Sequence, residues 1–473
     1  MRSPAVSVDF GVKPLIPKAN QSPPELTMRV ERIIQASIFD IFAGHEIGRE
    51  LKAMSRWLDG HPMLVALVAD DLRRHGVRET GRRGLPAESA LRCGLLKQHR
   101  QLSYEELAFH LEDSSSFRAF ARLPLSWTPK KSVLHKTISA IRAETWEAIN
   151  RTILASAREE RLEPGRMVRL DSTVTAALMH EPSDSSLLWD AVRVMVRLLQ
   201  AADALIGGAV VTWRDHRRAA KKRARAIEFT RGRPNRVPHY RELVKLTRAT
   251  LAYLDQTSTR LAAVADPRVE PWQAELRRYH PLIERIIWQT ERRVFFGEAV
   301  AADDKIVSLF EPHADIIVKG SRDAAYGHKL NLITGRSGLI LDVVIETGNP
   351  ADSERFLPML ERHIAFYGKA PRQAAADGGF ATRHNLSQAK ARGVRDVAFH
   401  KKAGLRIEDM VKSRWIYRKL RNFRAGIEAG ISWIKRSYGL ARCTWRGLDH
   451  FKAYIWSSVV AFNLALFARL KPI

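Results

Sequence analysis

Three acidic residues lie at positions where a folded chain can bring carboxylates together. Asp171 ends the short apolar segment RMVRLDST, Asp377 ends a later apolar segment, and Glu428 lies in a long helical stretch. Ligands gather where strands end at one edge of a sheet, so we expect both aspartates there and Glu428 on a helix packed against the sheet. Converging carboxylates repel one another unless they bind cations, and oxygen-only ligands suit Mg²⁺, with Mn²⁺ as the alternative.

A pair of such ions performs a particular chemistry on nucleic acids. Two divalent ions about 4 Å apart activate a water or a 3′-hydroxyl and stabilise the leaving oxygen during in-line attack on a phosphodiester. The phosphate backbone, which bare carboxylates would repel, would be held by Arg424, Lys435 and Lys329. His328 could also touch phosphate. An ordinary strand with a histidine at the edge of the core is an equally good interpretation of His328 and Lys329.

One helix must position Glu428, and the sequence predicts it from Ser413 to Gly439. Its apolar residues recur at alternating three- and four-residue steps, which is the pattern of a helix with one face on a core. Ser413 can cap its start, and Gly439 can end it. Arg424 precedes Glu428 by one turn, so the two also fit a simple exposed ion pair worth about 0.2–0.5 kcal/mol. The helix alone does not decide between a site and a surface pair.

The elements around these residues alternate between strands and helices. RMVRLDST, GHKLNLITG and GLILDVVIETG read as strands, and a turn at residues 336–338 joins the last two. The first strand is separated from the second by more than a hundred residues of helical pattern. A helix, a strand at 372–377, a helix, a strand at 394–399 and the Glu428 helix follow. This order predicts an α+β protein with a mixed sheet flanked by helices.

The chain divides into parts by the type of pattern that each carries. A flexible tail precedes an all-α domain, a sheet domain follows, and a large helical insertion interrupts the sheet domain after its first strand. The expected bounds are 1–24 for the tail, 25–160 for the helical domain, 161–180 and 300–473 for the sheet domain, and 181–299 for the insertion.

The helical domain contains a compact module of short helices. SALRCGLLKQHR and SYEELAFHLED read as two helices, and a capping box of Ser103 and Glu106 opens the second. A long helix is expected from Lys130 to about Glu160, with Pro129 at its first position. The module resembles a helix-turn-helix that enters the DNA major groove, although any small bundle reads the same way.

Composition points to a polyanionic partner. Lys and Arg exceed Asp and Glu by 27 in 473 residues, and the isoelectric point is near 10.4. Such an excess favours nucleic acid or an anionic membrane surface. The densest basic run lies in the insertion, where only Asp215 and Glu228 oppose it, and we expect it to contact phosphates. The run includes Arg217, Arg218, Lys221, Lys222, Arg223 and Arg225.

Three features of the sequence indicate the cellular compartment of the protein. Cys93 and Cys443 are too few and too far apart for a disulfide framework, which fits a reducing cytosol. The first 24 residues lack the apolar core of a signal peptide. Residues 453–468 carry no charge, but the stretch contains Asn463 and is shorter than the roughly 20 residues of a membrane span. We expect a buried helix packed on the Glu428 helix, in a cytoplasmic protein with no membrane partner.

Together these motifs resemble the DDE transposases of bacterial insertion sequences. Arg424, Glu428 and Lys435 have the spacing of the family's Arg–Glu–Lys signature around the third acid. RLDST and AADGGF resemble the first two acid motifs, YGHKLNLIT and ETGNPADSERF resemble the hairpin and the turn after it, and SALRCGLLKQHRQLSYEELAFHL resembles the amino-terminal helical domain. Arg421 departs from the pattern, because the family usually has an aromatic residue there. The loosely classified ISNCY-type elements are the group that the chain resembles most.

The resemblance implies an RNase H-like catalytic core in which Asp171, Asp377 and Glu428 are catalytic ligands of two Mg²⁺ ions. It implies a DNA transposase that cleaves the ends of its element and joins them to target DNA. The partner would be double-stranded DNA, held by a homodimer or larger oligomer. Two other classes fit the same residues: a domesticated DNA-binding protein without catalysis, and an RNase H-like nuclease that cuts without joining.

Overall fold

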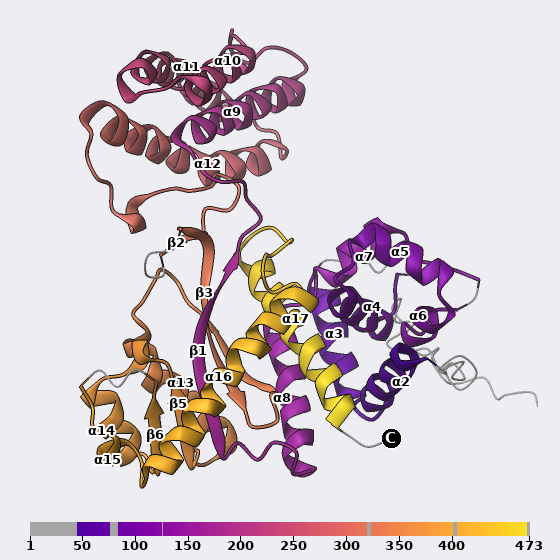
Figure 1. Ribbon diagram of the computed structural model, residues 1–473. Coiled ribbons are helices and arrows are strands. Elements are labelled where there is room, and N and C mark those ends of the chain that lie inside the picture. Colours follow the sequence, from indigo (N-terminus) through magenta and orange to yellow (C-terminus); the bar gives the residue numbers. More distant parts are fainter. Residues whose placement is uncertain (1–44, 76–83, 125, 319–322, 401–403, 471–473) are drawn as a thin grey trace, which may run out of the picture.

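The computed structural model describes residues 45–75, 84–124, 126–318, 323–400 and 404–470. The tail expected at 1–24 lies outside the described residues. Figure 1 shows a sheet with helices packed around it, a group of amino-terminal helices beside it, and a separate helical body at the top. The expected fold class is confirmed, because the protein is α+β with a mixed sheet, an all-α amino-terminal region and a helical insertion after the first strand. The proposed domain boundaries stay predictions.

One long strand, β1, organises the sheet. The strands are β1 (Met167–Ala176), β2 (Asp315–Ile317), β3 (Ala325–Gly335), β4 (Ile340–Ile345), β5 (Gln373–Ala376) and β6 (Asp396–Phe399). β1 pairs antiparallel with β3 and parallel with β5, and β6 lies parallel beside β5. β2 and β4 pair with successive parts of β3. Leu170 is paired with Ala376, so Asp171 and Asp377 follow paired residues on two neighbouring strands. The expectation that Asp171 ends its strand is wrong, because β1 continues to Ala176 through its pairing with β3, whereas Asp377 directly follows β5.

Two helices cover opposite faces of β1. Along a strand, successive side chains point to opposite faces. Arg169 donates to a backbone carbonyl of α16 (Arg414–Ser437), whereas the Ser172 hydroxyl donates to the first residue of α13 (Asp352–Tyr367). α16 runs across β1, β5 and β6, as its apolar stripe predicted, and Ser413 caps it by accepting from a backbone N–H.

The amino-terminal helices share one continuous hydrophobic core with the sheet. They are α2 (Glu46–Asp59), α3 (Met63–Arg74), α4 (Ala87–Arg100), α5 (Tyr104–Asp113), α6 (Ser115–Phe120), α7 (Lys131–Ile138) and α8 (Ala143–Glu159). The capping box at Ser103 is present. Every residue of α4 except Arg100 is buried, and α5 exposes Glu105 and Glu112. The helix-turn-helix hypothesis therefore rests on α7, which exposes Lys131 and Lys136.

The long helix expected from Lys130 to Glu160 is wrong, because α7 and α8 are separate helices. Asp71, which is buried in α3, causes the break. It accepts a hydrogen bond from the backbone N–H of Arg142 at 2.9 Å and another from the Arg142 guanidinium. This contact satisfies a backbone donor at the start of α8 and favours a new helix start there.

The uncharged stretch near the carboxyl end is the core helix α17 (Leu448–Leu470). Within the described chain, it alone has the length and hydropathy of a membrane span, and 83% of its most apolar window is buried inside the protein. The expected burial is confirmed. The expected contact with α16 is present, where Trp433 and Tyr438 pack against Phe462, but α17 packs chiefly against α8 and α4.

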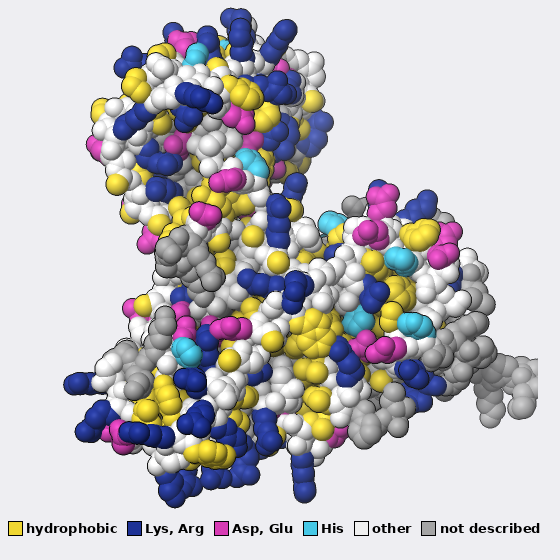
Figure 2. Space-filling view, viewed as in Figure 1, with side chains coloured by type: hydrophobic (Ala, Val, Ile, Leu, Met, Phe, Trp, Pro, Cys, Tyr) yellow, Lys and Arg dark blue, Asp and Glu magenta, His cyan; other side chains and the backbone are white. Residues whose placement is uncertain are grey.

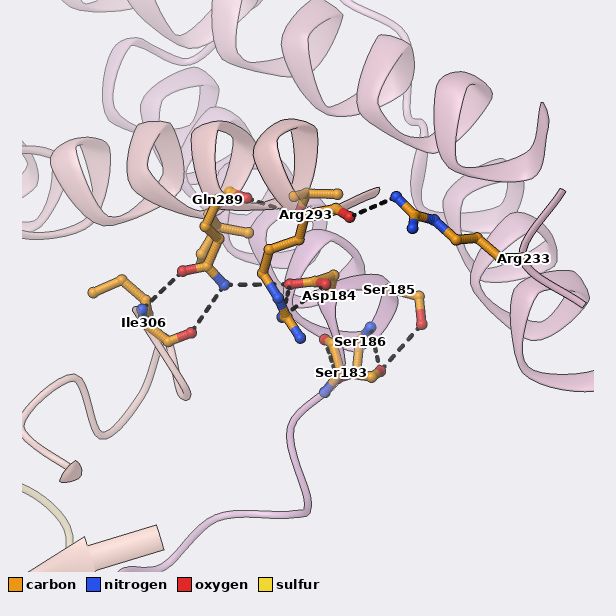
Figure 3. A network of polar contacts seen from close by, with 10 residues as sticks. Ser183, Asp184, Ser185, Ser186, Arg233, Gln289, Arg293 and Ile306 are labelled. Carbon is orange, nitrogen blue, oxygen red and sulfur yellow. Dashed lines mark hydrogen bonds and ion pairs between the residues drawn. The ribbon is translucent and has the colours of Figure 1, made fainter. Parts of the chain in front are cut away.

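The insertion has a hydrophobic core of its own. It consists of α9 (Asp184–Ile206), α10 (Arg217–Phe229), α11 (Arg233–Leu261) and α12 (Val269–Thr290). Figure 3 shows the polar network at its base. Asp184, at the start of α9, lies 2.8 Å from the Arg293 guanidinium. Gln289 bonds both backbone groups of Ile306, where the chain returns towards the sheet.

We expect Asn463→Leu to destabilise the shared core. The Asn463 amide bonds the backbone N–H and carbonyl of Ile340 in β4 and the Asn150 side chain in α8. Leucine would leave three buried polar groups without partners at about 1–3 kcal/mol each, so the free energy of unfolding should fall by at least about 3 kcal/mol. Chemical denaturation measures the loss. Leu464→Met, at a neighbouring buried position, is the control and should cost less than about 1.5 kcal/mol; equal losses would contradict the assignment.

Removing Arg293 from the ion pair at the base of the insertion should destabilise the protein more than neutralising Asp184. Burial raises the pKa of Asp184 despite the nearby Arg293, so the folded state gains little from the ionised carboxylate. Arg293→Ala leaves that carboxylate uncompensated and should cost about 2 kcal/mol, less than a fully buried pair because Arg293 is 41% exposed. Asp184→Asn should cost less than Arg293→Ala. Because the folded pKa is raised, the loss in Arg293→Ala should shrink as the pH falls towards that pKa; thermal unfolding at several pH values tests both statements.

Candidate active site

The three predicted acidic side chains meet at one guanidinium. Arg424 Nη2 lies 3.1 Å from Asp171 Oδ2 and 3.6 Å from Asp377 Oδ2. Arg424 Nη1 lies 2.7 Å from Glu428 Oε1. Arg424 is therefore more than the exposed partner of Glu428 that the helix alone allowed. The structure brings together the three acids that the sequence singled out, and their roles in catalysis and metal binding stay predictions.

Backbone contacts fix the two aspartates. Asp171 Oδ1 accepts from the N–H of Ser172 at 2.8 Å, and Asp377 Oδ1 accepts from the N–H of Gly378 at 2.7 Å. Both therefore turn Oδ2 towards Arg424. The exposed fraction of the side chain rises from 13% for Asp171 to 40% for Asp377 and 65% for Glu428. The site is closed at β1 and open to solvent at α16.

A glycine lets α16 approach β1 closely. A Cβ atom on Gly426 would lie 2.5 Å from Arg169 Nη1. Arg169 donates to the carbonyl of Phe423 at 2.7 Å and to Thr334 Oγ1 at 2.8 Å, and its guanidinium lies over the Phe423 ring. Arg169 thus fixes the helical turn that carries Arg424.

A fourth acid, Asp352, links the segments that carry the two aspartates. Its Oδ2 accepts from the Ser172 hydroxyl at 3.2 Å, and its Oδ1 lies 2.6 Å from Lys329 Nζ. A Cβ atom on Gly379 would lie 2.9 Å from Asp352 Oδ2. Sequence reasoning missed this link, because Asp352 also reads as an ordinary helix start. The small residue Gly379, just after Asp377, was the available signal of a close approach.

The structure places His328 and Lys329 in the interior. His328 is 2% exposed; its Nε2 lies 2.8 Å from His313 Nδ1, and its Nδ1 lies 3.0 Å from the Glu346 carbonyl oxygen. Lys329 is 4% exposed and also donates to the carbonyl of Pro350. Of the two interpretations of the sequence, the histidine at the edge of the core is the one that fits. We therefore do not include either residue in the proposed DNA surface.

The basic run of the insertion lies on the surface. Arg217, Arg218, Lys221, Lys222 and Arg225 on α10 are exposed, and Arg223 is half-buried. Of these, Arg217 pairs with Asp215 at 2.6 Å. Figure 2 shows Lys and Arg side chains gathered over the insertion and along the lower edge of the sheet body.

The exposed face of α16 carries a second basic series. Arg414, Arg418 and Arg421 are exposed, and they recur with Glu428 on one face of the helix. Arg421, where the family usually has an aromatic residue, therefore continues a line of arginines that leads to the acids. Lys435 is half-buried, about two turns beyond Glu428.

The donor set fits divalent cations. Within the described chain, no group of three or more His, Cys, Asp and Glu side chains is already arranged as a metal site, and a guanidinium lies between the three acids. The three acids nevertheless offer only oxygen donors, which suit Mg²⁺ or Mn²⁺. They already surround one cationic group, and the exposed side chains of Asp377 and Glu428 leave the site accessible.

Two family models match the chain. The Transposase DDE domain matches residues 295–464, which include Asp377, Arg424 and Glu428, and the Transposase domain (DUF772) matches residues 41–144. Asp171 and most of the insertion lie outside both matches. No curated protein and no solved structure gives a significant match. The two matched segments together show that the chain belongs to the DDE-type transposases of insertion sequences.

Proposed function

We propose that this transposase cleaves the ends of its insertion sequence and joins them to target DNA by metal-dependent phosphodiester transfer. The convergence of Asp171, Asp377 and Glu428 on one guanidinium carries the proposal, because the same oxygens can serve as ligands of divalent cations. Two Mg²⁺ ions, or Mn²⁺, would supply the charge that activates a water or a 3′-hydroxyl and stabilises the leaving oxygen.

The side chains of the site would have different roles, according to how firmly each one is held in place. Asp171 is nearly buried and fixed by a backbone N–H, so it would set the position of the reacting phosphodiester relative to the sheet. Asp377 is held in the same way at the end of the neighbouring strand. Glu428 is the most exposed of the three and can reorient when substrate arrives. Arg424 and Lys435 would hold phosphate oxygens next to the acids.

The DNA would contact two basic surfaces. One is α10, whose exposed Arg218, Lys222 and Arg225 recur on one helix face. The other is the arginine series of α16, which leads towards Glu428. Phosphate contacts of this kind give affinity without reading sequence. Joining two element ends requires both to be held together, and we therefore propose at least a homodimer on DNA.

Assays of DNA nicking and of strand transfer distinguish the two alternative classes of protein from this proposal. A domesticated DNA-binding protein would have no reason to keep three acids around one cationic centre, so metal-dependent nicking separates it from an active transposase. A nuclease that only cuts would release ends without joining them. A strand-transfer assay with pre-cut element ends decides between cutting alone and cutting with joining.

We expect Asp171→Asn, Asp377→Asn and Glu428→Gln each to lower the rate of end cleavage by at least about 10³-fold, because each removes charge that stabilises the transition state by several kcal/mol. DNA affinity should stay within about threefold in a gel-shift assay, because phosphate contacts by Lys and Arg supply most of it. Glu361→Gln, an exposed acid on α13 that pairs with Arg392, is the control and should keep activity. Cleavage by Glu428→Gln at the normal rate would refute the assignment.

The basic face of α10 predicts a change in the salt dependence of binding. Replacing Arg218, Lys222 and Arg225 together by Gln should flatten the slope of log K against log[salt] by about 0.9 for each phosphate that the variant no longer neutralises. Affinity titrations at several salt concentrations measure the slope.

A matched control for that experiment lies in the same insertion. Arg248, Arg268 and Arg277 are also exposed, but each is paired with a nearby acid. Replacing these three by Gln removes the same charge and should leave the slope nearly unchanged. Equal slopes in the two triple variants would mean that the basic face of α10 contacts no more phosphates than the control residues do.

A further inference from the structure

The guanidinium of Arg424 lies among the three acids that would hold a divalent cation. It contacts one oxygen from each of the three acids, at 3.1, 3.6 and 2.7 Å. We propose that Arg424 is a built-in counter-cation that DNA must displace: a phosphate of the bound DNA takes the guanidinium, and only then do the carboxylates accept divalent ions. This inference rests on the proposed function and adds an order of events to it.

The charge balance of the site supports the exchange. Three carboxylates face one guanidinium, so Arg424 offsets only part of their negative charge. A divalent ion that entered with Arg424 in place would meet a positive charge at short range, where repulsion is strong in the partly buried environment of a protein. Metal and guanidinium therefore compete for the same oxygens, and the bare protein should bind divalent ions weakly.

Arg424 can be moved without breaking other interactions. Its side chain is 10% exposed, and its Nη atoms bond only the three acids among the described residues. Its Nε is buried and has no hydrogen-bond partner in the part of the chain that the structure describes. A buried donor without a partner destabilises the position that leaves it unpaired, so the resting position holds Arg424 less firmly than a complete network would.

Phosphate is the chemically matched ligand to draw Arg424 away. A guanidinium binds phosphate through two parallel hydrogen bonds, as it binds a carboxylate. The open side of the site, at Asp377 and Glu428, is also where the arginine series of α16 would bring the DNA backbone. Arg421 lies one turn before Arg424 on this helix, so a strand held there would pass close to the Arg424 guanidinium.

The exchange makes metal binding and DNA binding mutually dependent. If DNA raises the affinity for metal by some factor, metal must raise the affinity for DNA by the same factor. The consequence is that the acids carry no reactive metal before substrate is in place, which would limit stray hydrolysis of other phosphodiesters.

Binding of Mn²⁺ alone to the full chain tests the proposal, followed by the electron paramagnetic resonance signal of free Mn²⁺. The wild-type protein should bind Mn²⁺ more tightly by about 5- to 150-fold, the usual range of such coupling, when a pre-cut duplex of its own element end is present. Arg424→Gln should bind Mn²⁺ tightly without DNA and gain much less when DNA is added. Arg424→Lys, which keeps the charge without the planar fork, should fall between the two.

Two controls distinguish a failure of this inference from a failure of the proposed function on which it rests. Arg421→Gln removes the same charge from an exposed position one turn away and should leave Mn²⁺ affinity without DNA close to that of the wild type. Asp171→Asn should weaken Mn²⁺ binding in every state. If the wild type binds Mn²⁺ equally well with and without DNA, and Asp171→Asn abolishes that binding, the counter-cation inference fails while the metal site stands. If Asp171→Asn changes nothing in either state, the proposed function fails as well.

Discussion

Three carboxylates cannot share one place in a folded protein without a cation between them. Side chains that all contact one guanidinium lie close together, and without a cation their negative charges would repel one another strongly in a partly buried environment. The chain supplies the cation from α16, one turn before Glu428 on the same helix. The position of α16 on the sheet is therefore stabilised by the ion pairs of Arg424, which link the helix to Asp171 within β1 and to Asp377 just after β5.

Two glycines lie where side chains of other segments come close to the backbone. Parallel pairing of β1 with β5 places Asp171 and Asp377 at one edge, but it does not bring a helix within reach of both. Gly426 allows α16 to lie against Arg169, and Gly379 allows the turn after Asp377 to lie against Asp352. At Gly426 the neighbouring atom is the end of the Arg169 side chain, and at Gly379 it is the end of the Asp352 side chain, so a larger residue at either position would first displace these side chains. The geometry of the site therefore depends on how Arg169 and Asp352 are held as well as on the three acids.

Local patterns in the sequence predicted most helices and strands, whereas features that depend on long-range contacts could not be predicted. Asp171 and Asp377 were found because each follows a short apolar run, and Glu428 because its helix has a regular stripe. The break between α7 and α8 could not be predicted, since it depends on Asp71 in another helix. The burial of His328 and Lys329 depends on β2, β4 and α13, which pack around β3. Spacing by four residues predicted the contact of Arg424 with Glu428, but it carries no information about the two aspartates that share the same guanidinium.

The separate core of the insertion gives the protein two bodies with different tasks. Its core is separate from the core that the sheet shares with the amino-terminal helices, and the polar contacts of Asp184 and Gln289 hold the base of the insertion together. Basic side chains on α10 can therefore contribute affinity without being built into the acid site, while the arginines of α16 lie on the helix that holds Glu428. Affinity and chemistry then meet at Arg424, because this side chain can bind both the acids and an incoming phosphate. A substrate held by α10 but placed away from α16 would leave Arg424 among the carboxylates, so correct placement of the DNA, rather than binding as such, would prepare the site for reaction.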